Sequence, residues 1–123
     1  MKSNPFRKIL LLDDDKIQKI IVEKTLFKID SGLEFVYFDL PTKALDFLKS
    51  ESVDVLLIDL NLPEMSGWEF VNAVEKFCPN STLILQSGSV DKDQVQRVLS
   101  DKRISKIMEK PLRESDLRSI LEL

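Results

Sequence analysis

The chain has 123 residues, with 18 Lys and Arg against 21 Asp and Glu, a net charge of −3, and no histidine. This length suits one domain with its own core, and the slight acidic excess disfavours nucleic acid and anionic membrane surfaces, which attract basic faces. The absence of histidine excludes Ser-His-Asp and Cys-His nucleophiles and the usual zinc sites, so any metal would be bound by oxygen ligands.

Short apolar runs rich in Ile, Leu and Val alternate with helical patterns along the chain. The runs are Ile9–Leu12, Phe35–Phe38, Val53–Ile58, Leu83–Leu85 and Ile104–Met108. Each is brief and bounded by polar or turn residues, as buried strands are. The run from Val53 to Ile58 is almost continuously apolar, which is typical of a central parallel strand covered on both faces.

The segments between these runs are predicted to be helices. Their apolar positions are Ile17, Ile20 and Ile21, on one face with Lys24 and Lys28; Ala44, Leu45 and Leu48; Phe70, Val71, Val74 and Phe77; Val95, Val98 and Leu99; and Leu117, Ile120 and Leu121. Pro41 can open the second helix, and Ser66 with Glu69 predicts a capping box before the third. Arg113 or Ser115 lies near the start of the last.

Five strands alternating with five helices indicate an α/β fold, a doubly wound parallel sheet with right-handed crossovers. The sequence shows no internal repeat, low-complexity stretch or linker, and the last helical pattern runs almost to Leu123. We therefore expect a single domain over residues 1–123.

The cysteine content and the lengths of the apolar runs indicate the cellular compartment. Cys78 is the single cysteine, so no internal disulfide can form, which suits a reducing cytoplasm. The apolar stretch Ile9–Leu12 within Met1–Asp15 is too short for a signal peptide, and no run approaches the length needed to cross a bilayer. We expect a cytoplasmic protein.

Polar residues follow four of the predicted strands, where doubly wound sheets bind their ligands. They are Asp13, Asp14 and Asp15; Asp59 and Asn61; Ser87, Gly88 and Ser89; and Glu109, Lys110 and Pro111. Asp39 follows the second run, but an edge strand would hold it away from the others. The pattern thus predicts carboxylates, a hydroxyl and an ammonium group at one end of the sheet.

These groups suit phosphoryl chemistry. Clustered carboxylates repel one another unless they bind a cation, and octahedral Mg²⁺ accepts acidic oxygens, a backbone carbonyl and waters. A carboxylate can attack phosphorus to give an acyl phosphate, with Lys110 and the metal supplying positive charge and the Ser87 hydroxyl donating to a phosphoryl oxygen. Singly, each residue has a simpler interpretation: a solvated helix start, a turn, a loop or a surface lysine.

Four segments in this order resemble the receiver (CheY-like) domain of two-component response regulators, and the resemblance covers essentially the whole chain. The segments are Ile9–Asp15, Asp54–Gly67, Leu83–Gly88 and Lys110–Pro111. The resemblance implies a flavodoxin-like five-stranded sheet in the order 2-1-3-4-5, in a stand-alone receiver without an output domain.

The resemblance also implies roles for the strand-end residues. Asp59 is the expected phosphoacceptor, and Asp13 and Asp14 are the acidic pair that holds Mg²⁺, or Mn²⁺ as a substitute. Asn61 would add its backbone carbonyl to the metal. Asp15 matches a position that is often acidic without being a ligand.

Three further positions have expected roles around the phosphoryl group. Ser87 matches the Ser/Thr switch position, and Lys110 matches the lysine that pairs with the phosphoryl group. The Lys110–Pro111 bond would be cis, as this bond commonly is in the family. Asn61 and Ser89 are expected to influence the lifetime of the phosphate. One departure is Ile107, which stands three positions before Lys110, where the family usually has an aromatic residue whose rotamer follows activation.

The function implied is that of a switch rather than of an enzyme, apart from self-catalysed phosphorylation and dephosphorylation. Because the chain has no histidine, the phosphoryl group would come from a sensor histidine kinase or a histidine phosphotransfer protein. The first helix, around Gln18 and Ile21, would meet that donor, and the protein would then signal by binding another protein.

Two alternatives stay open from the sequence. The Asp13 and Asp15 spacing also matches haloacid-dehalogenase-type phosphatases, in which Asp13 would be the nucleophile, although these enzymes need a further acidic pair and usually more chain. The other alternative is a phosphorylation-independent binding module, which typically loses part of the acidic pocket.

Overall fold

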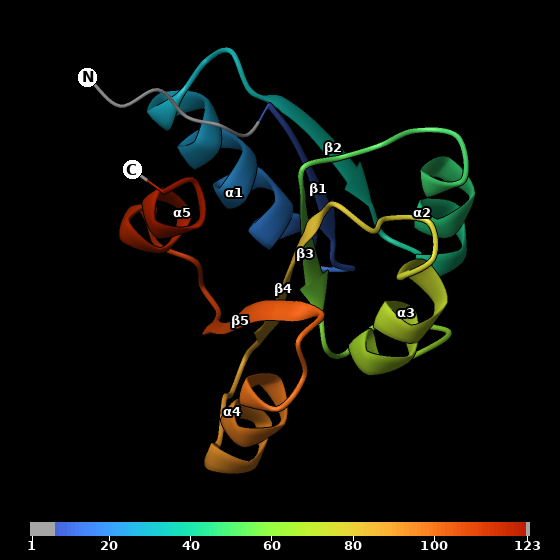
Figure 1. Ribbon diagram of the computed structural model, residues 1–123. Helices are drawn as coiled ribbons and strands as arrows, with labels where there is room; N and C mark the ends of the chain where they lie inside the picture. The colour runs from blue at the N-terminus through green and yellow to red at the C-terminus, as the bar shows by residue number, and fades with distance from the viewer. Residues whose placement is uncertain (1–6, 123) are drawn as a thin grey trace.

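The computed structural model describes residues 7–122, so residues 1–6 and 123 of the expected domain lie outside it. Five strands and five helices alternate along the chain, as predicted (Figure 1). Their bounds are β1 Lys8–Leu12, α1 Lys16–Ile29, β2 Glu34–Phe38, α2 Pro41–Leu48, β3 Val55–Asp59, α3 Gly67–Val74, β4 Thr82–Ser87, α4 Lys92–Leu99, β5 Ile104–Glu109 and α5 Glu114–Ile120.

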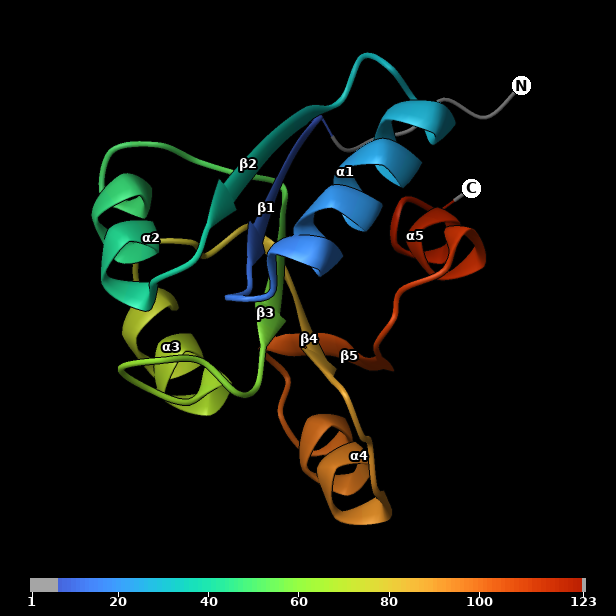
Figure 2. The ribbon, with the colours of Figure 1, turned by 180° about the vertical axis from the view of Figure 1, so that it is seen from behind.

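The strands form one parallel sheet in the order β2-β1-β3-β4-β5. Helices α1 and α5 cover one face of it, and α2, α3 and α4 cover the other (Figures 1 and 2). The predicted doubly wound fold and its strand order are therefore confirmed. Because all strands run the same way, their carboxyl ends meet at one edge of the sheet.

The core consists of two apolar clusters, one on each face of the sheet. Leu10 and Leu12 of β1 pack with Phe70 and Val71 of α3, whereas Leu11 packs on the opposite side with residues of α1 and α5. Each of these leucines is fully buried, which contributes roughly 1.5–3 kcal/mol per side chain. The continuous burial of β1 and β3 on both faces explains why their sequences do not alternate.

Local capping sets where several helices begin. Pro41 opens α2, and Ser66 and Glu69 form the predicted capping box of α3. Arg113 is the residue before α5. A second capping box, formed by Asp91 and Gln94, begins α4 and was not predicted.

Most predicted runs agree with the observed strands to within two residues at each end, and the bounds of β3 and α3 differ as follows. The third strand begins at Val55 rather than Val53, and just before it the Asp54 carboxylate accepts the backbone N–H groups of Arg7 and Lys8, each at 2.8 Å. At the other boundary, α3 ends at Val74, so Phe77 packs against the core from the segment after the helix.

The apolar face predicted for α1 is not the buried one. Ile17 is 70% exposed and Ile20 is 48% exposed, while Gln18, Val22 and Leu26 face the sheet. Helix α1 carries apolar residues on more than one side, so the spacing of these residues did not show which side packs against the sheet. The structure also corrects the expected donor surface, because Gln18 is buried and only Ile21 and its exposed neighbours remain accessible.

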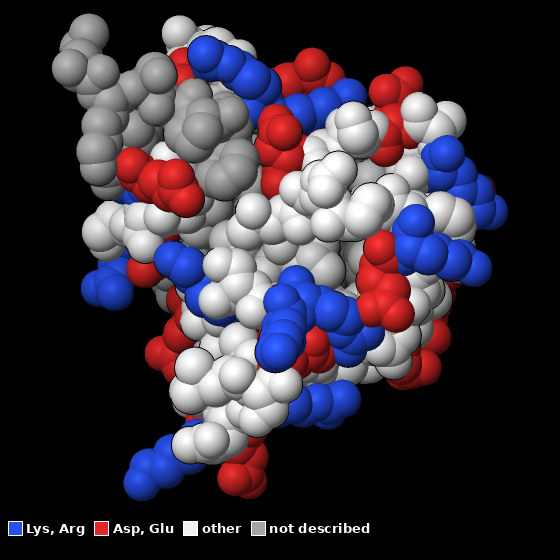
Figure 3. All heavy atoms as spheres, in the orientation of Figure 1, with Lys and Arg blue, Asp and Glu red and all other residues white. Residues whose placement is uncertain are grey.

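Charges of both signs lie interspersed over the face shown in Figure 3, as the near balance of acidic and basic residues suggests. No helix within residues 7–122 combines the length and the apolar character needed to cross a membrane.

Candidate functional site

Acidic side chains gather at the carboxyl edge of the sheet, where the topology brings successive strand ends together. Asp13 follows the last residue of β1, and Asp59 is the last residue of β3; neither is more than 2% exposed. Strands β1 and β3 pair in register up to Leu12 and Ile58, so the two aspartates are the next residues on neighbouring strands. Exposed Asp14 lies beside them.

The three aspartates are close enough to share one cation. Carboxylate oxygens of Asp13, Asp14 and Asp59 all lie within 4.8 Å of one another. The only nitrogen cation paired with them in the described part of the chain is Lys110, whose Nζ lies 2.9 Å from Asp59 Oδ2 and 3.2 Å from Asp13 Oδ2. Three carboxylates against one ammonium leave a negative excess, and an all-oxygen set of this kind fits a hard divalent cation such as Mg²⁺.

The pKa values of Asp13 and Lys110 show that burying these charged groups is unfavourable. Burial, helped by the nearby charge of Asp59, raises the pKa of Asp13 to about 6, against the lowering effects of the Asp15 backbone N–H and of Lys110. Burial opposes the charge of Lys110, but its hydrogen bond to Asp59 and the charges of both aspartates outweigh burial and raise its pKa. The site therefore holds excess negative charge in a place where charge is penalised.

Backbone groups hold both buried aspartates in place. The Asp15 N–H donates to Asp13 Oδ1 at 2.9 Å, and the Asn61 N–H donates to Asp59 Oδ1 at 3.0 Å. The Asp15 side chain itself caps α1 by accepting from the backbone N–H groups of Ile17 and Gln18. The Tyr37 hydroxyl donates to the Asp13 carbonyl at 2.7 Å, a contact that the sequence did not indicate.

The loop after Asp59 is packed tightly against the end of β3. A Cβ atom on Gly67 would lie 2.7 Å from the Asp59 carbonyl oxygen and 2.9 Å from the Leu60 Cα. The Gly67 N–H donates to the Leu60 carbonyl, and Asn61 bridges to Ser66, which closes the loop. Only glycine fits at position 67 without moving the backbone beside Asp59.

The remaining predicted residues come from β4 and β5. Ser87 is buried, and its hydroxyl donates to the Ser89 carbonyl at 3.0 Å, so in this structure it bonds within its own loop rather than to a carboxylate. The Lys110–Pro111 bond is cis, as expected. Glu109, also singled out from the sequence, accepts the Val90 N–H at 3.1 Å and so ties the loop before α4 to the end of β5.

One buried residue of the site was missed from the sequence. Gln86 is fully buried, and its Nε2 lies 3.4 Å from Asp13 Oδ2. Its Oε1 has no hydrogen-bond partner among residues 7–122. The available signal was a polar residue that closes an otherwise apolar run, directly before Ser87.

A hollow of about 680 Å³ opens over these groups. It is lined by Asp14, Asp15, Ile17, Gln18, Ile21, Asp59, Asn61, Gly88, Lys110 and Pro111. Asp39 is not part of the acidic cluster, as expected for an edge strand. Ile107, at the position of the expected aromatic, is half-buried and packs against the core on the side of α3 and α4.

The chain has recognisable relatives. The family model of the response regulator receiver domain matches residues 9–122. The autoinducer 1 sensor kinase/phosphatase LuxN of Vibrio campbellii is 23% identical over 92% of this chain, which spans 13% of that protein. The chain spans between 13% and 53% of the length of the curated relatives considered.

Solved structures share the fold. A two-component response regulator from Cytophaga hutchinsonii superimposes with a TM-score of 0.87 at 21% identity, covering 95% of both chains. A response regulator protein from Burkholderia pseudomallei, solved with a phosphorylated aspartic acid, a calcium ion and citrate, has a TM-score of 0.80 at 16% identity, covering 94% of this chain and 66% of its own.

Proposed function

We propose that this chain, which belongs to the response regulator receiver domain family, accepts a phosphoryl group on Asp59 and passes the signal on by binding another protein. Members of this family are phosphate-accepting signalling modules of two-component systems rather than classical enzymes. The observation that carries the assignment to Asp59 is its position: it is buried at the carboxyl end of β3, 2.9 Å from Lys110 and within the acidic cluster.

Each residue has a definite part in the proposed transfer. An Asp59 oxygen attacks the phosphorus of a phosphohistidine on the donor, the P–N bond breaks, and the imidazole leaves with the electron pair. Lys110 neutralises charge on the phosphoryl oxygens, since its ammonium already lies against Asp59. The Asn61 N–H orients the acceptor carboxylate, and Ser87 would turn from Ser89 to donate to a phosphoryl oxygen.

The metal assignment rests on the donor set. Asp13, Asp14 and Asp59, together with the Asn61 carbonyl, would hold Mg²⁺, with Mn²⁺ as a substitute. When bound, the cation would supply positive charge to the phosphoryl oxygens. The Burkholderia pseudomallei relative, solved with both a phosphorylated aspartic acid and a calcium ion, supports this assignment.

The phosphoryl donor would be a sensor histidine kinase or a histidine phosphotransfer protein in the cytoplasm. Ile17 and Ile21 line the rim of the acidic hollow, and with Ile20 they form an exposed apolar surface on α1. This surface lies where a donor must approach to bring its phosphohistidine to Asp59. An apolar contact there would exclude water while the transfer occurs.

Acetyl phosphate with Mg²⁺ provides the test, read by intact mass. We expect one added phosphoryl group on the wild-type protein and on the surface variant Asp46→Asn, but none on Asp59→Asn. Label that persists in Asp59→Asn and is lost in Asp13→Asn would instead identify a haloacid-dehalogenase-type nucleophile. A wild-type chain that takes no label from acetyl phosphate or from kinase-bound phosphohistidine would indicate a phosphorylation-independent binding module.

A further inference from the structure

Gln86 occupies a position where an apolar side chain would be expected. It follows Leu83, Ile84 and Leu85 in β4, and all four are buried. In the sheet it pairs in register with Asp59 on one side and Met108 on the other. Because side chains alternate along a strand, Gln86 faces the same side as Ile84, towards α1 and α5, which is also the side that Asp59 shares with Leu57.

Burying this amide is unfavourable for folding. The Gln86 Oε1 has no hydrogen-bond partner within the described chain, and a buried carbonyl without a partner keeps its full desolvation penalty. An apolar residue of the same size would avoid that penalty. The one polar contact that the Gln86 side chain makes in residues 7–122 is from Nε2 to Asp13 Oδ2, at 3.4 Å.

The two carboxylate oxygens of Asp13 have different hydrogen-bond partners, and this difference indicates the effect of the Gln86 contact. Oδ1 accepts from the Asp15 N–H, whereas Oδ2 accepts from Lys110 and Gln86. Lys110 is shared with Asp59, so a phosphoryl group on Asp59 would compete with Asp13 for the same ammonium. Gln86 is a donor that stays with Asp13, and because it is neutral it orients the carboxylate without cancelling its charge.

We propose that Gln86 is a positioning residue of the acidic site, which holds Asp13 in the orientation that binds the divalent cation. The proposal rests on the proposed function for the identity of the site, and adds a residue that acts on the metal through Asp13. Groups that orient metal-binding carboxylates commonly change metal affinity by about 10–100-fold when they are removed. The unsatisfied Oε1 is then the stability cost of keeping the donor in place.

The test is a thermal-shift titration of Gln86→Met with MgCl₂, which reports stability and metal affinity in one experiment. Methionine has a similar length but cannot donate, so we expect Mg²⁺ to bind about tenfold more weakly. Without Mg²⁺ the variant should melt higher than wild type by about 3 °C, since the unpaired carbonyl is gone. The matched control is Gln96→Met, at an exposed position of α4, which should change neither quantity.

The outcomes separate this inference from the proposed function. Equal Mg²⁺ affinity in Gln86→Met and wild type would overturn the positioning role and leave Asp59 phosphorylation intact. A lower melting temperature together with weaker Mg²⁺ binding would indicate a structural role and would also overturn it. A wild-type protein with no saturable Mg²⁺ response would contradict both the Mg²⁺ site of the proposed function and the positioning role of Gln86.

A measurement on wild type keeps the inference testable if Gln86→Met does not fold. The Nε2 protons of Gln86 should show a saturable chemical-shift change in ¹H–¹⁵N spectra as MgCl₂ is added. Side-chain amide signals of exposed Gln96 should stay unchanged over the same range. If Mg²⁺ binds while the Gln86 amide signals do not move, the residue does not sense the metal through Asp13.

Discussion

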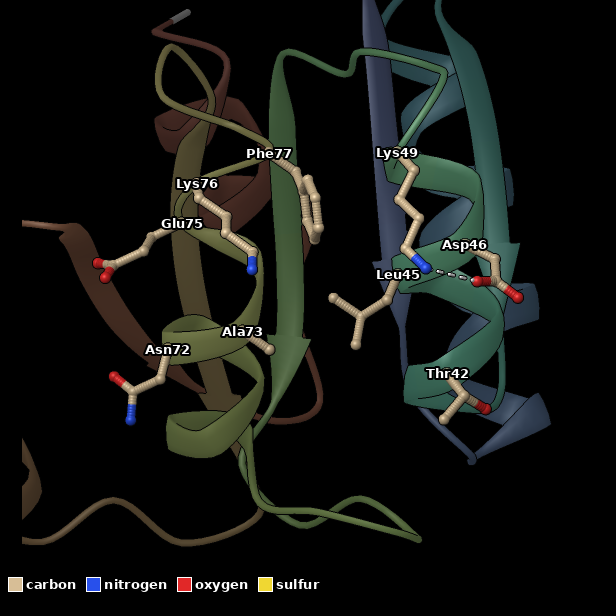
Figure 4. A pocket seen from close by; sticks show the side chains of 9 residues that line it. All are labelled: Thr42, Leu45, Asp46, Lys49, Asn72, Ala73, Glu75, Lys76 and Phe77. Carbon is tan, nitrogen blue, oxygen red and sulfur yellow. Dashed lines mark hydrogen bonds and ion pairs between the residues drawn. The ribbon is translucent and has the colours of Figure 1, made fainter.

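Two hollows on this molecule have different chemistry although both are open to solvent. The groove between α2 and α3, about 410 Å³, has Leu45, Ala73 and Phe77 among its lining, with charged residues around them (Figure 4). Its Lys49–Asp46 pair, 3.3 Å apart, has side chains 58% and 78% exposed. In the acidic hollow the Lys110 side chain is 17% exposed, and its partners Asp13 and Asp59 are almost completely buried.

Burial of charge, rather than the size of a hollow, therefore distinguishes the proposed phosphorylation site from the groove between α2 and α3. Exposed pairs such as Lys49–Asp46 contribute little to stability, because water already solvates both charges. Buried carboxylates in excess over their cation destabilise the fold unless something binds them. Substitutions in the two hollows should therefore have very different consequences.

The largest contrast is expected from removing one carboxylate in each hollow. Asp59→Asn should abolish transfer from acetyl phosphate, because the amide cannot form the acyl phosphate. Asp46→Asn should leave the rate unchanged. Intact mass after timed incubation measures both, and equal labelling of the two variants would break the distinction between the hollows.

The next contrast concerns the two lysines. Lys110→Met should slow phosphorylation by roughly 10²–10³-fold, since it removes the only ammonium paired with Asp59 in the described residues. Lys49→Met should stay within about twofold, because its charge is exposed and far from the chemistry. Rates at saturating acetyl phosphate and Mg²⁺ decide between them, and a Lys110→Met rate close to wild type would contradict the proposed role.

The third contrast is in how the free energy of unfolding of the metal-free protein depends on pH. Because the pKa of Asp13 is raised from 3.8 to about 6, the protonated form favours the fold, and that contribution is lost as pH rises through about 6. The free energy of unfolding should fall by up to about 3 kcal/mol from this group between pH 4 and pH 7. Asp13→Asn should lack this fall and be more stable than wild type at pH 7.5 by about 1–2 kcal/mol, after allowing for its weaker contact with Lys110.

Urea unfolding at several pH values in the presence of a chelator measures this effect. Asp46→Asn serves as the control and should follow the wild-type profile. Added Mg²⁺ should stabilise wild type more than Asp13→Asn, because only the wild type has the full carboxylate set. Parallel pH profiles for wild type and Asp13→Asn would mean that Asp13 does not bear the charge penalty.

The smallest effect is expected in the groove itself. Lys49→Ala should change the free energy of unfolding by no more than about 0.5 kcal/mol, because the ion pair that it breaks is exposed. Chemical denaturation provides the value, and the Mg²⁺ titration should be unchanged. A loss of more than about 2 kcal/mol would show that the groove has an unrecognised structural role.

Much of the fold could be predicted because it depends on local patterns. Short apolar runs marked all five strands, and Ser66 with Glu69 marked the start of α3. Boundaries were less accurate, as at the start of β3, because an apolar run does not show which of its residues pair in the sheet. The buried side of α1 was also missed, because a helix with apolar residues on several sides does not reveal which side the sheet will cover.

The amino-acid pattern alone was enough to place Asp13, Asp14, Asp59 and Lys110 at strand ends, because polar residues that follow apolar runs lie at the carboxyl edge of a parallel sheet. How strongly these groups interact depends on the folded chain, since burial and separation are set by segments that are distant in the sequence. The fold brought Lys110 against Asp59, buried Asp13 among apolar strands, and placed Gln86 beside Asp13. Local patterns carry no information about such contacts, so Gln86 could not be predicted as the third donor to Asp13, beside the Asp15 N–H and Lys110.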